Sequence, residues 1–222
     1  VYRDIKQSEI YECLSAFSRQ MRGAADAAGS RDTVKSNLQR SAWHVSAAHG
    51  YCTAVSSLQA ALSESACRSE GLRKLSEYLS SYTEQESFQR CREEAASIQE
   101  LLEDFHLILE IEDNKVVITA GKRSGAYARR LGYGEGTKGL TSFSGVPGMS
   151  PLEEAVFEAY RKKNPAIFDR VESFAEHYPF YADGTILQLE QEIQYYLAFY
   201  RFEMKMKEQG FSFCTPEKAS DR

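Results

Sequence analysis

The residue types that commonly carry chemistry do not form a catalytic set in this chain. Its four histidines, at positions 44, 49, 106 and 177, lack the spacing of a helical metal-binding pair such as HxxxH. The five cysteines are widely spaced and form no CxxC pair, which favours buried, reduced thiols over a zinc site or a disulfide framework. We therefore expect no enzyme activity, no metal and no cofactor in this chain.

A glycine-rich stretch matches a nucleotide-binding motif only in its letters. Gly134 to Gly139 reads GxGxxG. A dinucleotide fingerprint needs a strand before it and a helix at its last glycine, and the sequence predicts neither. A Walker A motif is also absent, so we expect no ATP hydrolysis by this chain.

One segment differs from the rest by its charge. Residues 115–138 hold six basic side chains and one acidic side chain, a net of +5, while the whole chain is −5 and the remainder therefore −10. Eight glycines lie between Gly121 and Gly148. Basic side chains on an adaptable loop suit phosphate backbones, and interleaved aromatic rings can pack on sugars or bases. The candidate DNA-binding residues are Lys122, Arg123, Tyr127, Arg129, Arg130 and Lys138. The alternative is that these charges only keep an exposed loop soluble.

Helices are expected to position this segment. Apolar residues recur at steps of three and four along residues 10–28, 38–62 and 88–105, which is typical of amphipathic helices. Gly29 with Ser30 predicts the end of the first helix. Thr83 and Glu86 have the spacing of a capping box, which predicts a new helix there.

The second half of the chain carries similar signals. Pro151 and Pro165 each follow a capping residue type and predict helix starts. A last helix is predicted from about Asp183 to Gln209, with Gly210 as its stop. Its apolar residues fall on two faces, so we expect it to be central and packed on both.

Between these helical regions the pattern changes to that of a hairpin. Residues 107–111 and 115–119 are rich in β-branched side chains and flank a turn-forming Glu-Asp-Asn. The fold class is therefore mainly α, a long-helix bundle with a small β-hairpin, clamp-like insertion. Residues 1–105 would form the first part of the bundle, 106–149 the basic insertion and 150–222 the returning helices.

Several long stretches resemble proteins of the MutS family. They are Thr185–Phe199, Gly210–Glu217, Gly71–Leu79 and Arg40–Trp43. The resemblance implies the lever and clamp region of a cytoplasmic DNA mismatch repair ATPase, upstream of an ATPase domain that this chain lacks. ATP and magnesium, and a homodimer contact, would belong to that domain.

Two departures from the family concern its known sites. No nucleotide-binding residue can be transferred, because the ATPase domain is missing. Phe174-Ala175-Glu176 has the letters of the mismatch-reading Phe-x-Glu element but lies inside a predicted helix, so we expect no such role for it.

The function expected from the sequence is that of a DNA-binding, force-transmitting module of a MutS-like ATPase, with the DNA backbone as its partner and no membrane. The alternative is a helical protein-interaction module whose basic loop docks an acidic partner.

Overall fold

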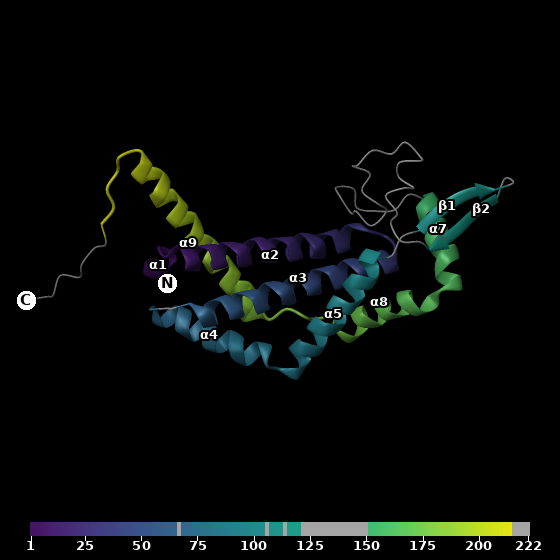
Figure 1. Ribbon diagram of the computed structural model, residues 1–222, viewed down its shortest axis with the longest axis horizontal. Coiled ribbons are helices and arrows are strands. Elements are labelled where there is room, and N and C mark those ends of the chain that lie inside the picture. Colours follow the sequence, from purple (N-terminus) through teal and green to yellow (C-terminus); the bar gives the residue numbers. More distant parts are fainter. Residues whose placement is uncertain (66–67, 105–106, 113–114, 121–150, 215–222) are drawn as a thin grey trace, which may run out of the picture. The chain divides into compact units, whose positions relative to one another are not determined.

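The computed structural model describes residues 1–65, 68–104, 107–112, 115–120 and 151–214 (Figure 1). This part of the chain is mainly helical, as the sequence predicts. The chain divides into two compact units, and the long helices α2 (Ser8–Thr33) and α3 (Asn37–Glu64) contribute residues to both. The first unit comprises Val1–Met21, Ala54–Glu84 and Ala182–Arg222, and the second comprises Arg22–Thr53 and Gln85–Tyr181.

The first unit joins segments that are far apart in the sequence. It contains α1 (Tyr2–Ile5), the beginning of α2, the end of α3, α4 (Glu70–Thr83) and α9 (Gly184–Glu208). Helices α1 and α9 are in direct contact. The amphipathic stripes meet in a core of almost fully buried side chains, among them Leu14, Phe17, Leu58, Leu79 and Ile186.

The second unit contains the rest of α2 and α3 together with α5 (Glu86–Asp104), α7 (Pro151–Lys163) and α8 (Pro165–His177). Helices α2 and α3 approach closely here, because a methyl group on Gly50 would lie only 3.2 Å from the Cβ atom of Ala24. Helix α8 packs on α5 and on α7. Its core includes Val45, Ile98, Val171 and Phe174. Phe174 is fully buried within α8, in keeping with the helical position predicted for the Phe-x-Glu letters.

Two strands follow α5 in this unit. Strands β1 (Leu107–Glu112) and β2 (Lys115–Ala120) pair antiparallel, from Leu107 opposite Ala120 to Glu112 opposite Lys115. The basic segment predicted to bind DNA begins at Lys115 in β2, but its remaining charges, from position 122 onwards, lie outside the described residues.

Both predicted ends of α9 are confirmed. The Asp183 carboxylate caps α9 by accepting the Ile186 N–H at 3.0 Å. At the other end Gly210 has φ of 90°. The Phe211 N–H then donates to the Met206 carbonyl at 3.1 Å, a Schellman-type closure that needs a residue in the left-handed region.

One predicted stop and one predicted cap are wrong, although the new helix α5 does begin at Glu86 as expected. Helix α2 continues past Gly29 to Thr33, where the Ser30 and Thr33 hydroxyls donate to the carbonyls of Asp26 and Ser30. Thr83 does not cap α5 either. It is the last residue of α4, and its hydroxyl donates to the Ser80 carbonyl. In both places hydroxyl groups bond back to the preceding turn, which the sequence alone does not distinguish from capping.

A buried carboxylate joins α1 to the start of α4 in the first unit. Asp4 is 2% exposed, and its Oδ2 accepts the backbone N–H groups of Ser69 at 2.7 Å and Arg68 at 3.2 Å. Burial raises the pKa of Asp4, but the hydrogen bonds from Ser69 and Arg68 outweigh it and hold the pKa below 3.8.

We expect Asp4→Asn to lower the free energy of unfolding at pH 7 by about 1–3 kcal/mol, because the neutral amide makes weaker bonds to these N–H groups. Since the folded-state pKa of Asp4 is depressed, its contribution is present above pH 3.8 and is lost as the pH falls through the folded-state value. Urea unfolding midpoints at pH 7 and pH 3 measure this. Asp26→Asn, at an exposed position, is the control. If the unfolding midpoints of wild type and Asp4→Asn differ by the same amount at both pH values, the lowered pKa of Asp4 does not contribute to stability.

Candidate functional site

The residues predicted to bind DNA cannot be placed relative to one another. Lys122, Arg123, Tyr127, Arg129, Arg130 and Lys138 all lie outside the described residues. Their assignment stays a prediction. Within the described residues, three other features can be described as candidate sites: the outer face of α9 in the first unit, and a buried histidine and a pair of buried thiols in the second unit.

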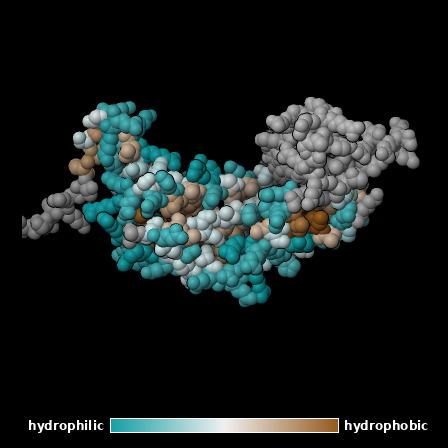
Figure 2. All heavy atoms as spheres, viewed as in Figure 1, coloured by the Kyte–Doolittle hydropathy of each residue, from teal (hydrophilic) through white to brown (hydrophobic). Residues whose placement is uncertain are grey.

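Helix α9 is apolar on two faces, but only one is covered. Ile186, Ile193 and Leu197 are at most 3% exposed and face the core of the first unit. The prediction that both faces are packed is wrong, because large apolar side chains on the other side remain open: Tyr195 at 70%, Phe202 at 52% and Phe199 at 42% exposed. Figure 2 shows hydrophobic residues among hydrophilic ones on this part of the molecule.

The aromatic surface continues past the end of the helix. Phe211 and Phe213 are 56% and 39% exposed. The reversal of the chain at Gly210 brings the Phe213 ring to 6.4 Å from that of Phe202. Exposed aromatic side chains that gather in this way are typical of binding surfaces rather than of a random apolar scatter.

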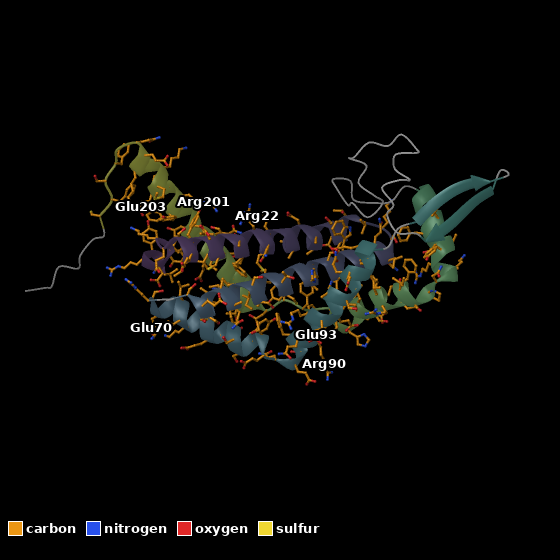
Figure 3. All side chains as sticks on the ribbon, in the orientation of Figure 1. Arg22, Glu70, Arg90, Glu93, Arg201 and Glu203 are labelled. Atoms are coloured by element: carbon orange, nitrogen blue, oxygen red, sulfur yellow. The ribbon has the colours of Figure 1, made fainter. Side chains whose placement is uncertain are left out.

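A buried carboxylate anchors the same helix. Glu203 and Arg201 are labelled on α9 in Figure 3. Glu203 is 2% exposed and forms ion pairs with Lys6 at 3.3 Å and Lys207 at 2.6 Å. Lys6 also lies 5.0 Å from the centre of the Tyr2 ring, and Tyr2 packs on Phe199 with their ring centres 5.2 Å apart. These contacts fix α9 to α1 and orient one edge of the exposed aromatic face.

Beside this anchor lies a hollow of about 420 Å³. Its lining includes Tyr11 and Tyr200, whose ring centres are 5.1 Å apart. Arg201 Nε donates to the Tyr11 hydroxyl at 3.2 Å. That bond, opposed by burial, holds the pKa of Tyr11 below 10.0. The charged residues around the hollow are Lys6, Arg201, Lys205 and Glu208.

His44 is the central polar residue of the second unit. It is 4% exposed and lies between the Arg31 guanidinium, at 3.0 Å from Nδ1, and the Tyr178 carbonyl, at 2.8 Å from Nε2. Arginine can only donate and a carbonyl can only accept, so Nδ1 must accept and Nε2 must carry the proton. Burial lowers the pKa of His44, the bond to Tyr178 opposes this, and Arg31 lowers it further. His44 is therefore a neutral structural residue and not an acid or base poised near pH 7.

The thiol pair lies on α3 and α5. Cys52 and Cys91 are buried, as predicted, and hydrogen-bond to each other. The bond to Cys91 and burial raise the pKa of Cys52, while the bond donated by Cys52 lowers the pKa of Cys91. Cys214 is exposed, so the prediction of buried thiols is wrong for this residue.

Sequence reasoning missed the polar contacts and the uncovered face. A signal for the face was present, because α9 carries two apolar stripes in its sequence. Nothing in the sequence marked Asp4, His44 or Glu203, since each acts through a partner far away in the chain.

Comparisons with known proteins add no identification. No family model, no curated protein and no solved structure matches the chain. Within the described residues, no group of three or more His, Cys, Asp or Glu side chains is arranged to hold a metal ion. In the same part of the chain, every helix is too short or too polar to cross a bilayer. The MutS resemblance therefore stays a prediction.

We expect Glu203→Gln to lower the free energy of unfolding by about 1–3 kcal/mol. The neutral amide cannot form the two ion pairs that the Glu203 carboxylate makes with Lys6 and Lys207. The matched control is Glu208→Gln on the exposed side of α9, expected within about 0.5 kcal/mol of wild type. Urea unfolding at pH 7 measures both, and equal midpoints for the two variants would show that the buried pair is unimportant.

A second prediction concerns His44. Its folded-state pKa is lowered from 6.5, so the unfolded chain binds a proton more readily and stability falls as the pH drops through about 6.5 towards the folded-state pKa. His44→Gln, which keeps a donor and an acceptor but does not titrate in this range, should flatten the stability profile between about pH 7 and pH 5. His177→Gln, on an exposed histidine, is the control. A profile for His44→Gln as steep as that of wild type would refute the assignment.

Proposed function

We propose that the chain is the lever and clamp module of a MutS-like DNA repair ATPase, and that it meets the DNA backbone through the basic segment 115–138. The observation that carries the proposal is the charge distribution. Six cations and one acid lie within 115–138, while the rest of the chain is strongly acidic. Such a contrast concentrates attraction for a polyanion at one place.

The helices support the mechanical half of the proposal. Helices α2, α3 and α9 have 26, 28 and 25 residues, above the ordinary length in globular domains. Each is fixed to its neighbours by buried apolar stripes and by polar contacts such as the one between Glu203 and Lys6. Stiff helices of this kind can carry a displacement from one end to the other.

The hairpin would form the base of the clamp. Strands β1 and β2 lie between α5 and α7 in the chain, and the basic segment begins with Lys115 at the turn end of this β-ribbon. The module itself would have no catalytic site. ATP, magnesium and the homodimer contact would belong to the ATPase domain of a longer cytoplasmic protein.

The second candidate is a protein-interaction module whose basic segment docks an acidic polypeptide. Because both ligands are polyanions, the two candidates differ in the relative affinity for a DNA duplex and for an acidic polypeptide of similar charge. Tighter binding of the polypeptide at equal ionic strength favours the second candidate and contradicts the first.

The test is fluorescence anisotropy of a labelled duplex across a salt series. We expect sequence-independent, micromolar or weaker binding, with a log–log salt slope of about −4 to −5 for roughly five neutralised phosphates. Arg129→Ala/Arg130→Ala should weaken binding on every sequence and flatten the slope by about two units.

The matched control is Arg73→Ala/Lys74→Ala, which removes the same two charges from the exposed surface of α4. It should bind like wild type apart from a small change in long-range attraction. Absence of binding by the wild-type chain at low salt, or equal losses in both double variants, would refute a specific role for the basic segment.

A further inference from the structure

A hollow of about 590 Å³ lies within the second unit. Its lining comes from the end of α2, the first turns of α3, and the end of α8 with the segment that follows it. Two arginines, Arg31 and Arg40, line it together with the polar side chains of Asn37 and Ser41. Its volume is in the range of sites that bind small molecules.

Both guanidinium groups are oriented by a fixed partner. Arg31 Nη1 donates to the buried His44 ring at 3.0 Å, and His44 is itself held by the Tyr178 carbonyl at 2.8 Å. Arg40 Nε donates to the Val34 carbonyl at 2.9 Å. Each of these bonds uses only one nitrogen, so the other donors of both planar groups remain for a ligand.

The acidic residues around the hollow do not neutralise both arginines. Glu172 is already paired with Arg161, and Glu176 is exposed at the end of α8. Asp32, which is 79% exposed, approaches the other arginine only to 3.7 Å. In the part of the chain that the structure describes, Arg40 forms no ion pair. The hollow therefore offers one loosely paired guanidinium group and one that no described carboxylate pairs.

We propose that this hollow binds a small phosphate monoester. Such a group carries a charge of about −1.5 to −2 at pH 7 and three acceptor oxygens, so it suits two guanidinium groups better than a singly charged carboxylate does. Asn37 and Ser41 add donors, and no acidic residue lies in the first turn of α3 to oppose an anion there. The inference depends neither on DNA binding by the segment 115–138 nor on an ATPase domain.

The lining also contains apolar residues, which favour an ester with a ring. Pro179 and Phe180 follow α8 and line the hollow, and Phe180 is 95% exposed. A ring bound beside the phosphate would cover part of Phe180, and such an aromatic pair strengthens binding by about three- to tenfold. Phenyl phosphate is therefore a suitable probe, and inorganic phosphate is its counterpart without the ring.

Isothermal titration calorimetry of the 222-residue chain with phenyl phosphate tests the proposal. The dissociation constant should be on the order of 0.1–1 mM, because the hollow is open and the ligand is small. Inorganic phosphate should bind about three- to tenfold more weakly, and Phe180→Ser should remove this difference. A wild-type chain that binds neither ligand at about 10 mM overturns the proposal.

The arginine itself is tested by Arg40→Gln, which should weaken the binding of phenyl phosphate by about tenfold because the charge and the forked donors are lost. Arg40 is exposed, so the circular dichroism of the variant should match that of wild type. The matched control is Arg22→Gln, at an exposed arginine of the same unit that is labelled in Figure 3. It should stay within about twofold of wild type, and equal losses in both variants would overturn the site.

A second control separates this site from the basic segment. Arg129→Ala/Arg130→Ala should bind phenyl phosphate like wild type. A loss of binding in this variant, with Arg40→Gln unaffected, would assign the ligand to the segment 115–138 and overturn the proposal.

Glu176→Gln should gain affinity, a result that misfolding cannot produce. It removes a negative charge from the lining and should tighten the binding of phenyl phosphate by about two- to threefold. The matched control is Glu93→Gln on α5, also exposed and in the same unit, which should bind like wild type. Unchanged or weaker binding by Glu176→Gln contradicts an anion in this hollow.

A phosphodiester distinguishes a small monoester from a nucleic-acid backbone. Methyl phenyl phosphate keeps the ring but carries one negative charge, as each backbone phosphate of DNA does. It should bind at least about fivefold more weakly than phenyl phosphate, because one of the two arginines is then left without a matching charge. Equal or tighter binding of the diester would assign the hollow to a nucleic-acid backbone and overturn the monoester.

Discussion

The structure depends on covering the apolar stripes of its long helices. Isolated helices are marginal in water, so α2, α3 and α9 are stable because their stripes meet others in the same unit. In the first unit this brings together the beginning, the middle and the end of the chain. The covering is complete for α2 and α3 in the described residues but not for α9. Its Tyr195, Phe199 and Phe202 remain 42–70% exposed, so this face of α9 is not covered by the described residues.

A few buried polar groups then fix how these stripes meet. Asp4 accepts N–H groups at the start of α4, Glu203 pairs with two lysines, and His44 joins Arg31 to the Tyr178 carbonyl. Each of these groups is satisfied by specific partners, so its burial favours one arrangement of the helices over a slipped one.

The helical elements could be predicted from the sequence because their signals are local. The stripe of α5, the start of α9 near Asp183 and the stop at Gly210 each involve residues within a few positions of one another. The predicted stop at Gly29 was wrong because glycine is tolerated inside a helix. The predicted cap at Thr83 was wrong because its hydroxyl donates to a carbonyl of the preceding helix instead. The contacts of Asp4 and His44 could not be foreseen, since partners 65 and 134 positions away are set by tertiary packing. The prediction that α9 is packed on both faces was wrong for a related reason. Periodicity reveals an apolar face, but it does not reveal whether the same chain supplies the partner.

The central proposal is that the chain meets DNA at its basic segment while its helices act as the support. Hydrogen–deuterium exchange with and without a duplex tests this at the level of individual segments. The account predicts slower exchange within 115–138 when DNA is added, with changes extending into the adjoining α5 and α7 and none at the outer face of α9. Protection confined to other helices, with 115–138 exchanging at the same rate in both states, would contradict it.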